Sequence, residues 1–151
     1  MFGEERAKMM AERIRAIGAE NGISFKSGGK IGATETSHRL IQYAWNVSPE
    51  AQDRVVEELF KGYMENEQDI TDLKFIAEAG ERAGLNKAEV EKYLRSDEGK
   101  EEVEEEATNA RLAGISGVPN FVINDTFEIG GSQDPAHFIA AFKRAKTASV
   151  E

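Results

Sequence analysis

The chain has 151 residues and a formal net charge of −9, with 40% hydrophobic and 31% charged residues, which predicts one soluble, helix-rich domain large enough to bury a core. The excess of acidic residues argues against nucleic-acid binding, which requires a cationic surface. No apolar segment approaches the ~20 residues of a membrane span or has the pattern of a secretory signal, so we expect a cytoplasmic protein that does not bind membranes.

The first part of the chain has apolar residues three and four positions apart, as in helices. A helix is expected over residues 4–20, with four residues on its apolar face: Ala7, Met10, Ile14 and Ile17. Residues 27–32 form a glycine-rich loop that lacks the Gly-Lys-Ser/Thr sequence of a phosphate-binding loop, so we interpret it as a flexible turn. A second helix is expected over residues 34–46, with these residues on its apolar side: Leu40, Ile41, Ala44 and Trp45.

Capping residues mark the starts of the next three helices. Ser48-Pro49 combines an N-cap with proline at the first helical position. The helix that follows is expected to bury Val55, Val56, Leu59, Phe60 and Tyr63. Asp72 is expected to cap a fourth helix that ends at Gly84, and Asn86 a fifth that continues through Leu94.

A sixth helix is expected to begin after Ser96 and to run towards Leu112, and its first part is strongly acidic. Residues 97–106 contain seven acids and one base, for a net charge of −6. Such a run can bind a cation or a basic partner, or it can be a solvated helix face whose first acids favour the positive end of the helix dipole. We favour the solvated face.

The pattern changes at the Gly-Val-Pro sequence of residues 117–119. Phe121-Val122-Ile123 predicts a short strand, and Asn124-Asp125 predicts a tight turn into a second short strand. Because proline cannot donate a ladder hydrogen bond, Pro119 belongs at the start or the edge of its strand. A final helix is expected over residues 135–146, with these residues on one stripe: Phe138, Ile139, Phe142 and Ala145.

The chain contains no cysteine. Disulfides, thiolate nucleophiles, thiolate metal ligands and dithiol redox chemistry therefore have no residue to carry them. The two histidines, His38 and His137, lie about a hundred positions apart, and neither has the spacing of a metal site around it. We expect no catalytic residue for thiol chemistry, no metal and no cofactor, and we expect His137 to be exposed.

Several segments together resemble the DsbA-like thioredoxin-fold family of the FrnE type, which is related to 2-hydroxychromene-2-carboxylate isomerases and kappa-class glutathione transferases. The matching segments are Gly22–Phe25, Gly28–Gly32, Ser37–Leu40, Gly84-Leu85, Gly114–Asn124 and Ile129–Pro135. The resemblance extends from about Arg6 to Ala145. It implies an α+β, mostly helical protein: a partial thioredoxin-like (DsbA-like) fold with a helical insertion domain and a C-terminal β-hairpin plus helix.

The resemblance also implies a domain arrangement and a departure from the family. Residues 1–151 would form a single DsbA-like domain, with a helical region over about 34–113 and a thioredoxin-like remainder over about 4–31 and 114–147. Members of the family begin with a strand, a Cys-x-x-Cys turn and a second parallel strand, whereas this chain begins at the helix that follows them. We therefore expect a member or fragment of an oxidoreductase family that lacks the Cys-x-x-Cys half and is inactive in thiol chemistry.

The resemblance carries over three candidate binding residues. Val118 and Pro119 match the family's cis-proline loop, whose backbone pairs with an extended substrate peptide; the alternative is a turn that only starts the strand. His38 matches a helix histidine near the substrate pocket of the isomerase branch. Because His38 lies next to the apolar Leu40 and Ile41, we expect a partly buried packing residue rather than a base.

Two functions remain open from the sequence. Without the first strand, the Phe121–Ile123 strand would have an open apolar edge, which predicts a homodimer through that edge or through exposed helix faces, or binding of an extended peptide. The alternative is a small-molecule isomerase of the 2-hydroxychromene-2-carboxylate type, in which His38 and nearby carboxylates transfer protons.

Overall fold

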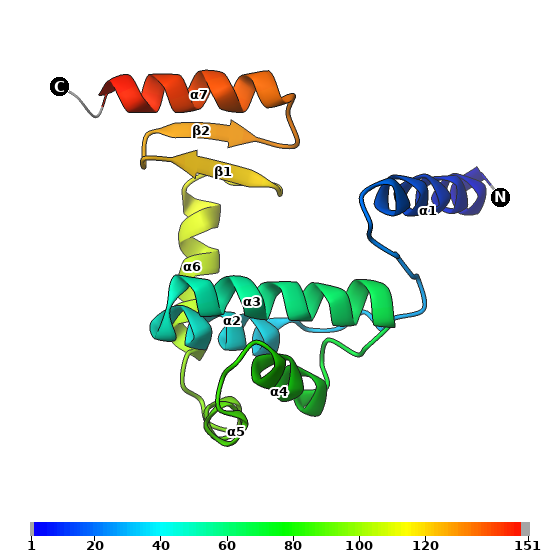
Figure 1. The fold of residues 1–151 in the computed structure, drawn as a ribbon, viewed down its shortest axis with the longest axis vertical. Helices are drawn as coiled ribbons and strands as arrows, with labels where there is room; N and C mark the ends of the chain where they lie inside the picture. The colour runs from blue at the N-terminus through cyan, green and yellow to red at the C-terminus, as the bar shows by residue number, and fades with distance from the viewer. Residues whose placement is uncertain (1, 149–151) are drawn as a thin grey trace. The chain divides into compact units, whose positions relative to one another are not determined.

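The computed structural model describes residues 2–148, with the side chains of Phe2 and Glu4 excepted. The elements are α1 (Phe2–Glu20), α2 (Glu35–Val47), α3 (Pro49–Phe60), the π-helix η1 (Lys61–Glu65), α4 (Leu73–Arg82), α5 (Lys87–Arg95), α6 (Lys100–Leu112), β1 (Asn120–Ile123), β2 (Phe127–Gly130) and α7 (Pro135–Ala148) (Figure 1). The expected order of helices, hairpin and final helix is confirmed. No helix in residues 2–148 is both long and apolar enough to cross a membrane.

The chain divides into two compact units, Met1–Glu104 and Glu105–Glu151. The first contains α1 to α5, η1 and the beginning of α6, and the second contains the rest of α6, the hairpin and α7. The predicted arrangement of one domain with a helical region over about 34–113 stays a prediction.

The first unit is built around a core shared by α2, α3, α4 and α5. Its most deeply buried large side chains are Leu40, Val55, Ile76 and Val90, each fully inaccessible to solvent. The three predicted N-caps are confirmed: the side chains of Ser48, Asp72 and Asn86 accept backbone N–H bonds from the first turns of α3, α4 and α5. Local hydrogen bonding therefore starts these helices where the sequence predicts.

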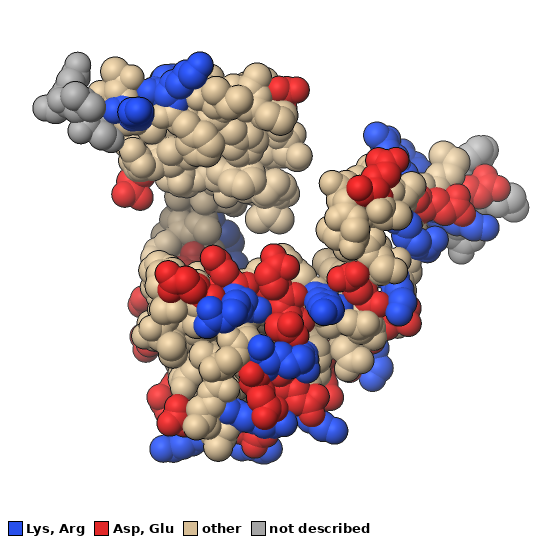
Figure 2. Space-filling view, in the orientation of Figure 1, with Lys and Arg blue, Asp and Glu red and all other residues tan. Residues whose placement is uncertain are grey.

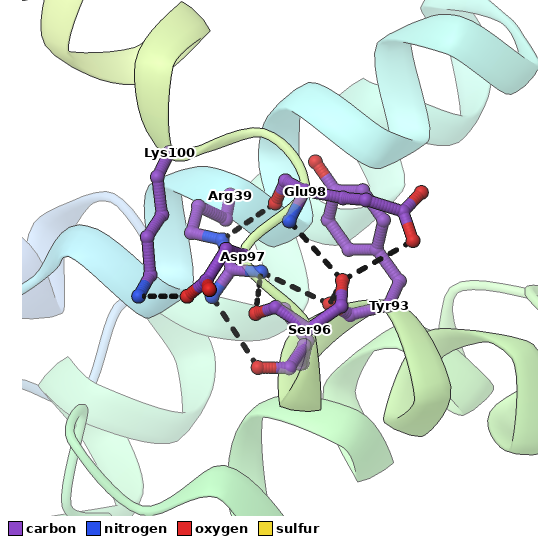
Figure 3. A network of polar contacts seen from close by, with 7 residues as sticks. Arg39, Tyr93, Ser96, Asp97, Glu98 and Lys100 are labelled. Atoms are coloured by element: carbon purple, nitrogen blue, oxygen red, sulfur yellow. Dashed lines mark hydrogen bonds and ion pairs between the residues drawn. The ribbon is translucent and has the colours of Figure 1, made fainter.

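Arg39 lies in this core with only 2% of its surface exposed, which its sequence context does not predict. Its guanidinium donates to four main-chain carbonyls around the end of α5: those of Tyr93 (2.9 Å), Leu94 (3.3 Å), Ser96 (2.9 Å) and Glu98 (2.8 Å) (Figure 3). It also lies over the Tyr93 ring, 5.4 Å from the centroid. Because carbonyls at a helix C-terminus carry partial negative charge, they stabilise the buried cation and tie α2 to α5.

Four residues that the sequence placed on the apolar sides of helices are about half exposed. The exposed fractions are 50% for Trp45, 57% for Phe60, 53% for Ile139 and 55% for Phe142. The apolar face of α1 is likewise uncovered, with Met10, Ile14 and Ile17 each about half exposed. Periodicity identifies an apolar face but does not say whether another element covers it, and of these positions only Phe60 was expected to be buried, which is wrong.

The beginning of α6 differs from expectation. The helix α6 begins at Lys100 rather than directly after Ser96, because Gly99 has a φ of +77° and closes a turn before it. Asp97 therefore precedes the helix, and the acids of its first turn are Glu101 and Glu102. None of the residues of α6 is buried, in agreement with a solvated face.

The end of α3 continues as the π-helix η1, which the apolar spacing does not predict. Gly62 lies inside η1 and is buried, and the ring of Phe75 from α4 packs directly on it. A Cβ atom at residue 62 would overlap with Phe75 Cε2 and Cζ. Glycine therefore allows α4 to approach the backbone of η1.

The second unit is a two-stranded antiparallel hairpin against which α7 packs (Figure 1). Asn120 faces Gly130 and Ile123 faces Phe127 across the pair. The turn is tight as predicted, because Asn124 and Asp125 both have positive φ, of 49° and 53°, the geometry of a type I′ turn. Asn and Asp tolerate this region better than most residues, so the local sequence favours the hairpin.

Candidate functional site

Val118 and Pro119 lie in the loop between α6 and β1, immediately before the strand. Their peptide bond is cis. The Pro119 carbonyl accepts a hydrogen bond from the Gly131 N–H at 2.8 Å, so pairing along the hairpin continues one residue beyond both strands. The Val118 side chain is 91% exposed, and its backbone makes no hydrogen bond within residues 2–148.

A groove of about 310 Å³ lies beside this loop. Residues 114–120 line one side, and Glu128, Gly130 and Gly131 contribute from β2 and the residue after it. Asn120 is also part of the lining, and its side-chain Nδ2 is buried without a hydrogen-bond partner in the described chain. A buried donor without an acceptor costs free energy.

The β1 strand has an unpaired edge among the described residues. Its sheet contains only β1 and β2 in residues 2–148, and alternate residues of a strand direct N–H and C=O groups away from their neighbour. Phe121 and Val122 are 41% and 57% exposed, and the Phe121 ring contacts Phe138 of α7 edge-to-face with centroids 5.0 Å apart. The edge therefore offers backbone hydrogen-bonding groups next to apolar side chains.

His38 lies on the first turn of α2 in the first unit, at a separate cleft of about 320 Å³. Its Nδ1 is 2.7 Å from the Thr34 carbonyl oxygen, which also accepts a 2.8 Å hydrogen bond from the buried Ser37 hydroxyl. The His38 side chain is exposed, so the expectation of a partly buried packing histidine is wrong. The residue is on the rim of the apolar core because it precedes Arg39 and Leu40, which point inward. His137 is exposed on α7, as expected.

The comparisons with known proteins identify the family. The family model described as DSBA-like thioredoxin domain matches residues 3–143 of this chain. The chain belongs to the DsbA-like thioredoxin domain family. No curated protein matches it.

A solved structure supports the DsbA-like fold. The probable DsbA oxidoreductase from Streptomyces coelicolor superposes with a TM-score of 0.85 at 24% sequence identity. The match covers 95% of this chain and 62% of the Streptomyces chain, so this chain spans less than two thirds of that protein. The predicted fold class, a mostly helical DsbA-like fold with a small sheet, is confirmed.

Within the DsbA-like fold, three carboxylates hold the segment that borders the His38 cleft. Glu65 accepts from the Ser24 N–H at 2.9 Å, and Glu67 accepts from the Gly28 N–H at 2.8 Å. The Lys30 ammonium lies 3.2 Å from an Asp69 carboxylate oxygen. The Gly28 amide is therefore bonded to a carboxylate, which agrees with a structural turn rather than a phosphate-binding loop. The acidic residues at positions 65, 67 and 69 were the sequence signal from which these three contacts could have been predicted.

The stabilising effect of the Asp69 contacts is expected to depend on pH. Hydrogen bonds from the Thr71 hydroxyl (2.6 Å) and N–H (2.9 Å), with the Lys30 ammonium, lower the pKa of the Asp69 carboxyl to about 2. Because the folded-state pKa lies below the ordinary 3.8, the ionised carboxylate stabilises the fold above that value, and this contribution is lost as the pH falls through about 2.

We expect Asp69→Asn to lower the melting temperature at pH 7 and the difference from the native chain to shrink between pH 4 and pH 2. Thermal melts of both proteins at pH 7, 4 and 2 measure this. Asp53→Asn, at an exposed carboxylate of α3, is the matched control. A deficit for Asp69→Asn that is the same at all three pH values would contradict the prediction.

Proposed function

We propose that this polypeptide is a FrnE-type member of the DsbA-like family without thiol–disulfide activity, and that it works by strand addition at β1. A second copy of the chain is the partner we favour, and an extended peptide would use the same edge. The observation that carries the proposal is the open edge of β1 among the described residues, with the exposed Val118 and its unbonded backbone directly before the strand. The strand edge and the Val118 backbone are both available to a second chain that extends the sheet.

The chemistry of the edge supports strand addition. A strand edge provides a row of N–H and C=O groups that a second extended chain can pair with, and exposed apolar side chains add burial. The visible face of the hairpin and α7 carries few acidic or basic side chains, whereas α2 to α5 show both signs closely interspersed (Figure 2). Because charged residues oppose edge-to-edge association, their scarcity over β1, β2 and α7 favours a partner here.

The absence of cysteine supports the redox part of the proposal. Thiol–disulfide exchange requires a thiolate, and none of the 151 residues can supply one. We expect the polypeptide to reduce insulin no faster than buffer with the same dithiol reductant. Turnover above that background would contradict the proposal for the redox chemistry and leave the strand-addition proposal to be tested separately.

Association through β1 makes a specific prediction. We expect a dimer at micromolar concentration, and we expect Val122→Lys to raise its dissociation constant at least tenfold, because the lysine places a charge on the strand edge. Light scattering coupled to size exclusion over a range of concentrations measures both.

Two matched variants locate the interface. Val47→Lys adds the same charge to a 59% exposed valine at the end of α2 and should leave the dimer unchanged. Ile139→Lys adds a charge on the exposed face of α7 and tests whether the dimer forms through helix faces instead. A monomer at every concentration overturns self-association, and a dimer that is weakened only by Ile139→Lys moves the interface from the strand edge to α7.

A small-molecule isomerase is the second candidate, and the apolar cleft at His38 is the observation that favours it. Proton transfer also needs a partner group, and the cleft lining in the described chain contains no Asp or Glu. The carboxylates expected beside His38 are therefore not among the described residues that line the cleft. If an isomerase activity is found, retention of full activity by His38→Ala would exclude His38 as its base.

A further inference from the structure

The cleft beside His38 has the size and lining of a small-molecule site. It measures about 320 Å³, and Ile31 of its lining is 94% exposed. Its walls come from the loop before α2, from α2, α3 and η1, and from Ile70. The apolar residues of the lining are Ile31, Ile41, Val56, Leu59, Phe60, Met64 and Ile70. Binding pockets for small molecules are concave and mostly apolar, with a few polar groups that fix orientation.

Three polar groups of the cleft, the Thr34 carbonyl, the Ser37 hydroxyl and the His38 ring, have a defined hydrogen-bonding state. The Thr34 carbonyl can only accept, so the His38 Nδ1 that lies 2.7 Å from it carries the proton. In the neutral imidazole the other nitrogen, Nε2, is then an acceptor. Nε2 has no partner in the described chain. The Ser37 hydroxyl proton is already donated to the same carbonyl.

The lining also excludes charged ligands. The described residues that line the cleft include no Asp, Glu, Lys or Arg, so a charged group would lose hydration without gaining a counter-ion. A ligand that fits both observations has an apolar body and a neutral O–H group. The apolar body would replace water along Ile41, Val56 and Leu59, and the O–H would donate to Nε2.

We propose that this cleft binds a neutral phenol or alcohol, with the hydroxyl donating a hydrogen bond to His38 Nε2. The site lies wholly within the first unit, so it is independent of association through β1. No bond is made or broken in this step. His38 acts as a ligand-binding residue, with Thr34 holding its tautomer.

A pair of matched ligands tests the hydrogen bond. 4-Propylphenol and 4-propylanisole share the apolar body, but only the phenol can donate. In calorimetric titrations at pH 8, where imidazole is ordinarily neutral, we expect the phenol to bind about threefold to tenfold tighter, the range for one hydrogen bond. His38→Phe keeps a ring but removes the acceptor and should bring the ratio of the two affinities to about one. 4-Propylbenzoate should bind more weakly than the phenol.

Two further variants test the place of binding. Val56→Phe fills the half-buried wall of the cleft and should weaken the phenol and the anisole alike, by at least tenfold. Val47→Phe, at the exposed end of α2 and outside the cleft, should change neither. Thermal melts check that each variant folds. If Val56→Phe does not fold, the affinity ratio in His38→Phe still decides the question.

Several results would overturn the proposal. Equal affinity for phenol and anisole, tighter binding of the benzoate, or an unchanged ratio in His38→Phe would each reject the hydrogen bond to Nε2. No saturable binding of 4-propylphenol would reject the site itself. A loss of dimer in Val56→Phe, with phenol affinity unchanged, would show that a second copy of the chain covers the cleft instead.

Discussion

Arg39→Ala is expected to lower the free energy of unfolding of the first unit by about 3–4 kcal/mol, which is a large part of the ~5–15 kcal/mol that stabilises a typical domain. The guanidinium makes four hydrogen bonds to carbonyls of residues 93–98 and is 2% exposed (Figure 3). Its removal leaves those carbonyls without their donor and opens a cavity between α2 and α5. Unsatisfied buried acceptors and lost packing both oppose folding.

The charge alone does not explain the expected loss. Lysine would keep the charge, but its single ammonium cannot donate to all four carbonyls that the planar guanidinium of Arg39 contacts. We therefore expect Arg39→Lys to recover less than half of the lost stability. Burial raises the pKa of the neighbouring Tyr93 hydroxyl, in agreement with a poorly hydrated environment around the network.

The single tryptophan, Trp45 of α2, provides the measurement, because its fluorescence reports on the first unit. Denaturant titrations of the native chain and the variants give the free energies. Arg54→Ala is the matched control: its Nε donates to one carbonyl, that of Ala83, at 2.8 Å, and its loss should cost about 1 kcal/mol. Similar costs for Arg39→Ala and Arg54→Ala would contradict the role assigned to the network.

Gly62→Ala is expected to destabilise the same unit by about 1–3 kcal/mol, although alanine is the better helix former by about 1 kcal/mol. The new Cβ would overlap with the ring of Phe75, which is 4% exposed and packed in the core. Either η1 or α4 must move to accommodate it. The same fluorescence titration measures the change.

Two comparisons isolate the overlap as the cause. Gly3→Ala lies in α1 with no atom within 4 Å of the new Cβ, so it should be neutral or slightly stabilising. In a Phe75→Leu background, Gly62→Ala should cost less than in the native chain, because the smaller side chain leaves room. A Gly62→Ala protein as stable as the native one would show that η1 does not need glycine.

The candidate site was partly accessible from the sequence. Val118 and Pro119 were found because their motif is local, and the structure places them at the open edge of β1. Asn120 was missed because its amide becomes an unpaired donor only after the hairpin buries it. His38 was assigned to the wrong environment, because the next two positions point into the core while His38 faces the cleft.

The sequence by itself determined the elements whose hydrogen bonds are local. Ser48, Asp72 and Asn86 bond within three residues of themselves, and Asn124-Asp125 closes its own turn, so neighbouring residues are sufficient to place α3, α4, α5 and the hairpin. The same local patterns indicated the DsbA-like family.

Only the tertiary structure decided what covers each surface. Arg39 bonds to carbonyls 54 to 59 positions away, and Gly62 is needed because a ring from another helix packs on it. Periodicity could not separate the buried Leu40 from the half-exposed Trp45, since both lie on apolar positions of α2. The burial of a residue depends on which elements pack against each other. That packing is stabilised by interactions between residues distant in the chain.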